Sequence, residues 1–337
     1  MRQSRKQEHI ENYLLSSYKN SNLFEDVYLS HVAVSDQNFN EIDTTTIFLG
    51  HKVSFPFMIN AVTGGNETAN GINEDLSKIA SKLNIPMAVG SQKIAIDAPD
   101  LSDSFKIVRK VNPNGIIIGN LGALCTPDEA KIAIEMINAN ALQIHLNLAQ
   151  ELVMTEGDRN FAGILNNIEK IVRSLHVPVI VKEVGTGISE KTAKRLYDIG
   201  VRNIDIAGKG GSNFIEIEDL RNPNLDANEL YEWGIPTALS LLEVMNLNKK
   251  DLNIISSGGI KTSQEIAKSI VMGAKMCAGS GEVINYLLRG GYDTALNYIK
   301  NLRHKLAIIM MLLEVKNIEE LGKVSYKITG KLKELSE

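Results

Sequence analysis

The densest group of polar side chains in the sequence lies in the stretch LQIHLNLAQE. This stretch holds His145, Asn147, Gln150 and Glu151, and the first two lie on the same side of an extended segment. Mg²⁺ typically takes only one or two protein carboxylates and completes its shell with water and substrate phosphate. One carboxylate beside amides and an imidazole therefore indicates a magnesium site, with Gln150 and Glu151 near the start of the following loop. A satisfied buried histidine and a solvent-facing glutamate are the alternatives.

Two glycine-rich stretches have the chemistry of an anion site. They are SSGGI at 256–260 and GSG at 279–281, and each follows an apolar run and leads into a segment of helical pattern. Glycine lets backbone N–H groups approach an anion, and the N-terminus of a helix adds its dipole. Gly-Gly before a helix is often no more than a tight turn. Two such loops after consecutive runs nevertheless favour a phosphate site.

A lysine ends one of the most apolar runs of the chain. Lys182 closes VPVIVK, where its ammonium would be poorly screened and would suit an electron-rich ring or a developing negative charge. An ion pair with Asp205, on the next run, is an equal alternative. Asn120, Thr63 and Ser91 follow other runs and suit the edge of a planar heteroaromatic cofactor, although each could be a turn residue.

The elements that must position these residues are eight short apolar runs alternating with segments of helical pattern, which is typical of parallel βαβ units. Eight strands close a (β/α)8 barrel, whose active site lies at the C-terminal ends of the strands. A doubly wound open sheet shows the same alternation and is the alternative fold. Helices are expected to begin at cap-type residues such as Thr126 and Ser189. The runs lie at 57–59, 87–89, 116–118, 142–144, 179–181, 203–206, 253–255 and 276–278.

The pattern divides the chain into three parts. We expect an N-terminal arm at 1–50 that contributes to the active site, the (β/α)8 barrel at 51–300 and a helical extension at 301–337. Residues 207–234 are expected to form an unusually long polar loop, and such loops in compact domains are usually functional or disordered.

The bulk composition limits the classes of function. Lys and Arg number 36 against 40 Asp and Glu, a balance too even for a nucleic-acid partner. Cys125 and Cys277 stand far apart in small or apolar surroundings, which supports neither a disulfide framework nor a Cys-based zinc site. The N-terminal charges precede no apolar core, and no stretch of about 18 apolar residues occurs. We therefore expect a soluble, cytoplasmic protein with no membrane partner.

Several familiar motifs are missing as well. The sequence has no H-E-x-x-H, no G-x-S-x-G and no Walker A motif, which argues against hydrolase and nucleotidyl-transfer chemistry.

Nine blocks of the sequence, spread in order over nearly the whole chain, resemble the type 2 isopentenyl-diphosphate isomerases. The resemblance implies a barrel enzyme of isoprenoid biosynthesis that interconverts isopentenyl diphosphate and dimethylallyl diphosphate without net redox change. It implies reduced FMN and Mg²⁺ as cofactors, NADPH or NADH as the reductant, and a homo-oligomer, either a tetramer or an octamer. The blocks are SRKQEH, NAVTGG, GSQ, GNLG, LQIHLNLAQE, VKEVG, DIAGKGGSNF, WGIPTALS and SSGGI.

The resemblance also implies roles for individual residues. Glu151 would bind the metal, and Gln150, Lys182 and His145 would act in catalysis. His145 and Glu218 are secondary candidates for taking the second proton. Substrate contacts are expected from Arg5, Lys6, His9, Asn147 and Gln150. FMN contacts are expected from Ala61, Val62, Thr63, Ser91, Asn120, Lys182, Ser212, Gly258, Gly259, Ser280 and Gly281.

Three positions depart from the family pattern without removing a charge. Val62 stands where Met is usual, Ala207 where Ser is usual, and SNF at 212–214 where Thr-Ser-Trp is usual. The first rival interpretation is an FMN-dependent 2-hydroxy-acid oxidase or dehydrogenase, which uses a histidine base late in the chain. Here His304 is the only histidine after the eighth run, in a helical segment. The second rival is a flavin-binding protein without catalysis.

Overall fold

The computed structural model describes residues 2–16, 20–222 and 224–337, without the side chains of 2–7 and 10. Its centre is a closed barrel of eight parallel strands in which neighbours in the chain are neighbours in space, and the last strand pairs with the first. The predicted barrel is therefore confirmed, and the open sheet is wrong. The strands are β4 Phe57–Ile59, β5 Met87–Ala88, β6 Ile117–Gly122, β7 Ala141–His145, β8 Val179–Lys182, β9 Asn203–Asp205, β10 Asn253–Ser257 and β11 Met276–Gly279.

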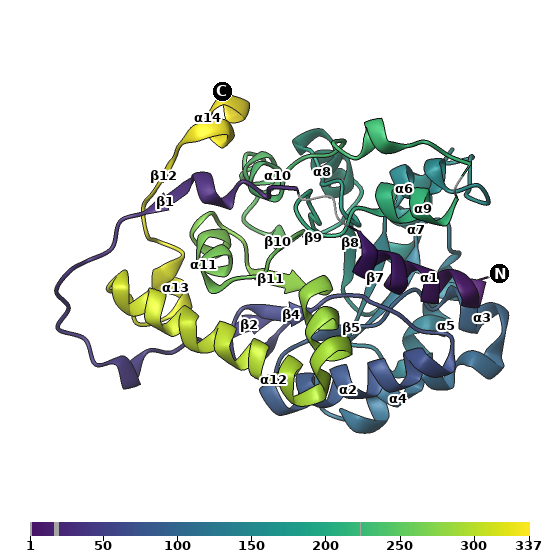
Figure 1. Ribbon diagram of the computed structural model, residues 1–337, viewed down its shortest axis with the longest axis horizontal. Helices are drawn as coiled ribbons and strands as arrows, with labels where there is room; N and C mark the ends of the chain where they lie inside the picture. The colour runs from purple at the N-terminus through teal and green to yellow at the C-terminus, as the bar shows by residue number, and fades with distance from the viewer. Residues whose placement is uncertain (1, 17–19, 223) are drawn as a thin grey trace.

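Helices cover the outside of the barrel (Figure 1). The two expected helix starts are found: the Thr126 hydroxyl accepts from the Glu129 N–H in a capping box at α5, and the Ser189 hydroxyl caps α8. The helices are α2 Glu67–Leu83, α3 Lys93–Asp97, α4 Asp103–Val111, α5 Pro127–Ile137, α6 Leu148–Val153, α7 Ile164–Ser174, α8 Glu190–Asp198, α9 Phe214–Arg221, α10 Thr237–Met245, α11 Ser263–Val271 and α12 Gly281–Leu312. No helix in the described part of the chain is both long and apolar enough to cross a membrane.

Two apolar layers stabilise the barrel, because successive side chains of a strand point to opposite faces. In β4, Met58 packs inside the barrel, whereas Phe57 and Ile59 pack in the layer beneath the helices. Phe48 and Val53, from the hairpin of β2 Thr46–Phe48 and β3 His51–Val53, join the interior cluster. This hairpin therefore closes the end of the barrel at which β4 begins.

A strand from the N-terminal part of the chain pairs with a strand from the C-terminal part outside the barrel. Strand β1 Val27–Leu29 pairs antiparallel with β12 Tyr326–Ile328, and Figure 1 shows the purple strand beside the yellow one. The C-terminal segment thus contains a strand between its helices, which the sequence did not predict. The remaining elements are α1 Arg2–Leu15, η1 Phe24–Asp26, η2 Phe39–Glu41, η3 Pro99–Leu101, η4 Asn228–Leu230, α13 Ile318–Leu321 and α14 Gly330–Ser336.

The polar segment at 207–234 is not a continuous loop, because it contains α9 and η4. The Asn213 side chain accepts hydrogen bonds from the Ile215 and Glu216 N–H groups and so caps α9. The helix was missed because it buries Glu216 and Glu218 as well as its apolar residues, which leaves it without an apolar stripe.

Candidate active site

A cavity of about 620 Å³ opens at the C-terminal ends of the barrel strands. This volume lies within the range of about 300–1,000 Å³ that is typical of small-molecule sites. Residues at or just after the ends of all eight strands line it, and helix α1 adds His9 and Tyr13. The predicted site residues that line the cavity are His9, Ala61, Val62, Ser91, Asn120, His145, Asn147, Gln150, Glu151, Lys182, Ser212, Gly258, Gly259, Ser280 and Gly281.

Three of the residues expected to contact FMN or the substrate are not among them. Thr63 is only 2% exposed, and its hydroxyl has no hydrogen-bond partner within the described structure. The backbone of Arg5 and Lys6 belongs to α1, but their side chains lie outside the described residues.

The glycine-rich loops after β10 and β11 lie at one side of the cavity. Gly258 and Gly259 both have positive φ, and a Cβ on Gly258 would lie 2.0 Å from the Gly208 oxygen. No other residue fits there, so the main chain itself lines this wall. Helix α12 begins at Gly281, directly at the cavity, where its dipole favours an anion. The Tyr13 ring of α1 packs against Gly281, so α1 reaches this wall of the cavity.

A chain of hydrogen-bonded side chains crosses the floor of the cavity. His145 Nδ1 lies 2.8 Å from Asn120 Oδ1, and Asn120 Nδ2 donates to Gln143 Oε1 at 3.0 Å. Gln143 Nε2 donates to Asn60 Oδ1 at 2.9 Å, and Asn60 Nδ2 donates to Asp205 Oδ2 at 2.8 Å. These contacts fix the orientation of His145 and Asn120. Sequence reasoning missed Gln143, because it stands inside the apolar run of β7.

Lys182 presents a buried ammonium to the cavity. It is 6% exposed, and its Nζ donates to the Glu183 main-chain oxygen at 2.5 Å. Asp205, which lies opposite it in the strand register, instead accepts hydrogen bonds from Asn60 and, at 2.5 Å, from Ser257. No ion pair joins Lys182 to Asp205 in the described structure, so that alternative is wrong.

The cluster after β7 is folded differently from the prediction. Gln150 and Glu151 lie in the short helix α6 rather than at the start of a loop, because α6 begins straight after Asn147. Asn147 Nδ2 donates to Glu151 Oε1 at 2.7 Å, and the Asp158 N–H donates to Glu151 Oε2 at 2.8 Å. Glu151 is thus oriented at the cavity wall. Among the described residues, no group of three His, Cys, Asp or Glu side chains could hold a metal.

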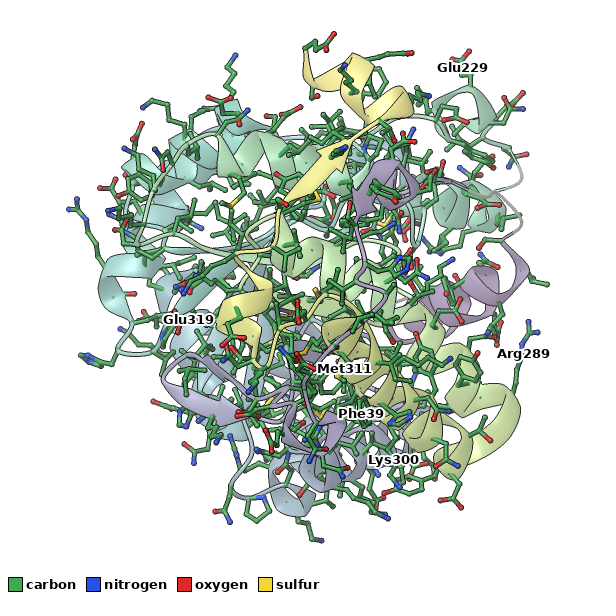
Figure 2. The ribbon with its side chains drawn as sticks, turned by 90° about the vertical axis from the view of Figure 1, so that its left-hand side faces the viewer. Phe39, Glu229, Arg289, Lys300, Met311 and Glu319 are labelled. Atoms are coloured by element: carbon green, nitrogen blue, oxygen red, sulfur yellow. The ribbon has the colours of Figure 1, made fainter. Side chains whose placement is uncertain are left out.

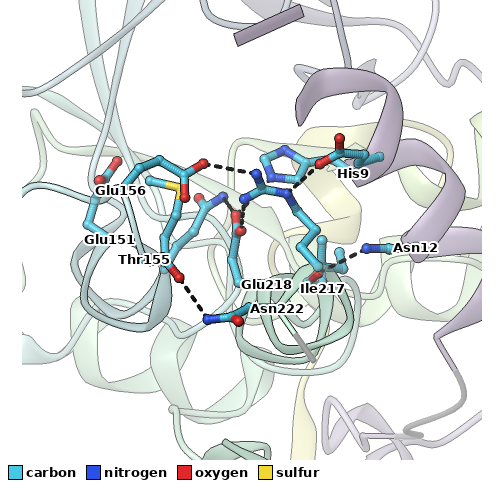
Figure 3. A network of polar contacts seen from close by, with 12 residues as sticks. His9, Asn12, Glu151, Thr155, Glu156, Ile217, Glu218 and Asn222 are labelled. Carbon is cyan, nitrogen blue, oxygen red and sulfur yellow. Dashed lines mark hydrogen bonds and ion pairs between the residues drawn. The ribbon is translucent and has the colours of Figure 1, made fainter. Parts of the chain in front are cut away.

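Glu218 of α9 lies directly behind the cavity wall. It is 1% exposed and does not line the cavity, but Gln150 and His9, which do, both contact its Oε1, at 2.6 and 2.8 Å (Figure 3). Arg221 donates to its Oε2. Burial opposes ionisation, but the hydrogen bonds of His9, Gln150 and Arg221 outweigh it and lower the pKa of Glu218 to about 2. An ionised carboxylate therefore anchors two cavity side chains.

Helix α1 lies on α9 at the mouth of the cavity. Asn12 Nδ2 donates to the Ile217 oxygen at 3.2 Å, and the His9 ring meets the Phe214 ring edge-on, with centroids 5.8 Å apart. Phe214 is one of the departures from the family pattern, and Val62 and Ala207 line the cavity with it.

His304 lies far from this arrangement. It belongs to α12 and lines a second cavity of about 450 Å³, together with Phe39 and Lys300, which Figure 2 labels. Its ring contacts Phe39 edge-on, and it does not line the first cavity. The late histidine base of the rival oxidase interpretation is therefore missing from the cavity.

Comparisons with known proteins agree with the resemblance that the nine sequence blocks show. Residues 129–327 match the family model of FMN-dependent dehydrogenases. The chain is 43% identical over 330 residues to an isopentenyl-diphosphate delta-isomerase of Geobacillus sp. (strain WCH70), covering 98% of this chain and 94% of the relative. It is 40% identical to a Listeria welshimeri protein of the same name, covering 99% and 94%.

Solved structures with the same fold are more distant in sequence. Flavocytochrome b2 with sulfite bound is 17% identical with a TM-score of 0.72, covering 96% of this chain and 83% of that one. A mandelate oxidase with a monooxide FMN adduct is 13% identical with a TM-score of 0.67, covering 94% and 95%. At these identities the likeness concerns the fold alone.

Proposed function

The chain belongs to the isopentenyl-diphosphate delta-isomerases, within the FMN-dependent dehydrogenase family, and from this we propose that it interconverts isopentenyl diphosphate and dimethylallyl diphosphate. The observation that carries the proposal is that one cavity combines three features. The glycine-rich loop at one wall is suited to an anion, Lys182 offers a cation, and Gln150 is held in place by its hydrogen bond to Glu218. An anionic cofactor and a small reactive substrate can share such a space.

The residues present fit FMN. The loop of Gly258 and Gly259 and the N-terminus of α12 offer main-chain N–H groups to a phosphate, and the unpartnered Thr63 hydroxyl is suited to a polar ligand atom. Lys182 would stabilise negative charge on the ring. When bound and reduced by NADPH or NADH, FMN supplies a titratable nitrogen that can exchange a proton with an alkene.

The residues also fit one Mg²⁺ held mainly by the substrate. Glu151 is oriented by Asn147 at the cavity wall, and a single carboxylate suffices when water and a diphosphate complete the shell. Mg²⁺ would offset the charge of the diphosphate. Arg5 and Lys6 would add cations from α1, on which His9 already faces the cavity.

Moving a double bond by one carbon requires that one proton is added to one carbon and that a different proton is removed from another carbon. Gln150 is the polar side chain best fixed for this, because its amide donates to Glu218 and is thereby oriented at the cavity wall. Glu218 receives a proton only through Gln150 or His9, since it does not line the cavity. A proton next to an electron-deficient carbon is acidic, so a relay of weak bases can accept it. His145 remains a second candidate.

The direct test is turnover. Purified protein with FMN, Mg²⁺ and NADPH should convert isopentenyl diphosphate to dimethylallyl diphosphate, and in D₂O the product should carry deuterium at the carbon that gains the proton. Oxidation of lactate or mandelate without isomerisation would support the oxidase instead. Flavin binding without either reaction would support the non-catalytic interpretation. The tetramer or octamer, the cytoplasmic location and the role in isoprenoid biosynthesis belong to the same proposal.

Replacing Glu151 with Gln should raise the Mg²⁺ concentration for half-maximal activity by about tenfold or more, because a neutral amide binds Mg²⁺ less strongly than a carboxylate. Activity measured against Mg²⁺ concentration tests this. Asp158→Asn, which removes an exposed acidic group from the same cavity, is the matched control. A normal Mg²⁺ requirement in the Glu151 variant would place the metal elsewhere.

Replacing Arg5 and Lys6 together with Ala should keep the fold and the flavin but raise KM for isopentenyl diphosphate about tenfold or more. This factor corresponds to about 1.4 kcal/mol of lost binding to the diphosphate. Lys331→Ala/Lys333→Ala, on the surface helix α14, controls for the loss of two positive charges. Steady-state kinetics within twofold of the parent would show that the N-terminal pair is only a solvated helix face.

A further inference from the structure

Three carboxylates from three separate elements converge on one guanidinium beside the cavity (Figure 3). Arg221 Nε donates to Glu8 of α1 at 2.8 Å, one terminal nitrogen donates to Glu156 at 2.9 Å, and the other donates to Glu218. Arg221 is only 14% exposed, and Glu156 lines the cavity just after α6. Each nitrogen of the guanidinium thus has its own partner.

The charge balance makes this arrangement depend on the arginine. Without Arg221, three carboxylates would face one another at the seam between α1, α9 and the segment after α6, and their repulsion would oppose the docking of α1. A lysine offers a single point charge, whereas the planar guanidinium offers donors in three directions. Burial opposes the charge on Arg221, but the hydrogen bonds that it donates to these carboxylates outweigh burial and raise its pKa.

We propose that Arg221 is a positioning residue for the reaction: it fixes the Glu218 carboxylate behind Gln150 and His9, and it holds α1 over the cavity. The first role follows from the shared carboxylate, since one oxygen contacts Arg221 and the other contacts the two cavity side chains. The second follows from Glu8, which lies one residue before His9 on α1. The inference rests on the proposed function, because the cavity it organises is the proposed substrate site.

The two roles have different experimental signatures. Glu218 is faced by His9 from α1, by Gln150 from α6 and by Arg221 on its own helix, with Glu8 and Glu156 beyond the guanidinium. Removing Arg221 takes away a cation and leaves two carboxylates nearby, so the pKa of Glu218 should rise. Protonation removes the negative charge of Glu218 and weakens the hydrogen bond that it accepts from Gln150. Activity should therefore fall on the acidic side.

The central experiment uses Arg221→Gln in the FMN-loaded, full-length protein. We expect kcat/KM for isopentenyl diphosphate to fall about 10- to 100-fold, which is typical of losing a partner behind a reactive side chain. An acidic limb should appear at a higher pH than in the parent, because the pKa of Glu218 rises when the cation is removed. Hydrogen–deuterium exchange should increase in residues 8–15, the C-terminal half of α1, and this readout needs no turnover. FMN affinity should stay within twofold.

Three further variants separate the roles. Arg221→Lys should restore much of the parent pH profile but not the slow exchange of α1, because one ammonium cannot serve all three carboxylates. Glu8→Gln should raise KM and the exchange of α1 without moving the pH profile. Arg202→Gln is the matched control, because Arg202 also pairs with a carboxylate, Asp251, and with main-chain oxygens but lies away from the cavity.

The outcomes that overturn the inference are specific. A pH profile like the parent's in Arg221→Gln would show that Arg221 does not position Glu218. Exchange of α1 no faster than in Arg202→Gln would show that Arg221 does not hold α1. Either result overturns the proposal. So would an equal loss of kcat at every pH, because a merely structural residue gives that result. Failure of the parent protein to isomerise the substrate would count against the proposed function, whereas the exchange data would still decide whether Arg221 holds α1.

Discussion

Glu218→Gln is expected to lower kcat for isomerisation by about 100-fold, the upper end of the range for a partner behind a reactive side chain. The parent carboxylate accepts hydrogen bonds from Gln150 and Arg221 and contacts His9. An amide has one oxygen and a nitrogen that donates, so it must turn its nitrogen toward one of these donors. At least one cavity side chain would then lose its fixed orientation. Steady-state kinetics with saturating FMN and Mg²⁺ measure the effect.

A matched control separates this effect from damage to α9. Glu216→Gln changes another buried glutamate of the same helix that does not line the cavity, and it should keep kcat within about threefold. Flavin titration should give the same affinity in both variants, since neither residue approaches the glycine-rich wall. Equal losses in the two variants would show that Glu218 supports the helix rather than the reaction.

Lys182→Met is expected to have the second large effect, on flavin affinity and on kcat together. The ammonium is buried at the cavity and has no carboxylate partner within the described structure, so a nearby anion interacts with it strongly. Losing one preorganised electrostatic contact of this kind costs about 10²–10³ in kcat. The reduction potential of bound FMN should become more negative as well, because the reduced, anionic form loses its cation. Potentiometric titration of the loaded protein measures this shift.

The same variant should be no less stable than the parent. Methionine has nearly the length of lysine, and replacing a buried charge that has one main-chain hydrogen bond by an apolar side chain is often neutral or stabilising. Lys268→Met is the control, because that ammonium also donates to a main-chain oxygen but lies outside the cavity lining. An unchanged potential in Lys182→Met, or an equal shift in the control, would refute the placement of Lys182.

The sequence was sufficient for the barrel because its signals are local. Each strand is a short apolar run, and helix starts such as the capping box at Thr126 depend on residues three apart. The strand ends were also predictable, since parallel strands of a closed barrel bring their C-terminal ends to one side. That geometry is why His145, Lys182 and the loop at Gly258 meet in one cavity.

The rest depended on contacts between distant segments. Glu8, Glu156 and Arg221 look like ordinary surface charges in the sequence, and only the packing of α1 and of the segment after α6 against α9 brings them together. Gln143 could not be predicted as a site residue, because it is a single polar residue within an apolar run. Its hydrogen-bond partners lie on other strands. No local pattern carries such information.

The pairing of β1 with β12 affects the order in which the parts of the chain reach their final contacts. Asp26 accepts a hydrogen bond from the Leu332 N–H, 306 residues later, so this contact forms only after the whole barrel has left the ribosome. The ribosome adds about 5–20 residues per second, and the parts of the chain that emerge first can fold first. The segment that follows α1 therefore reaches its final anchor last.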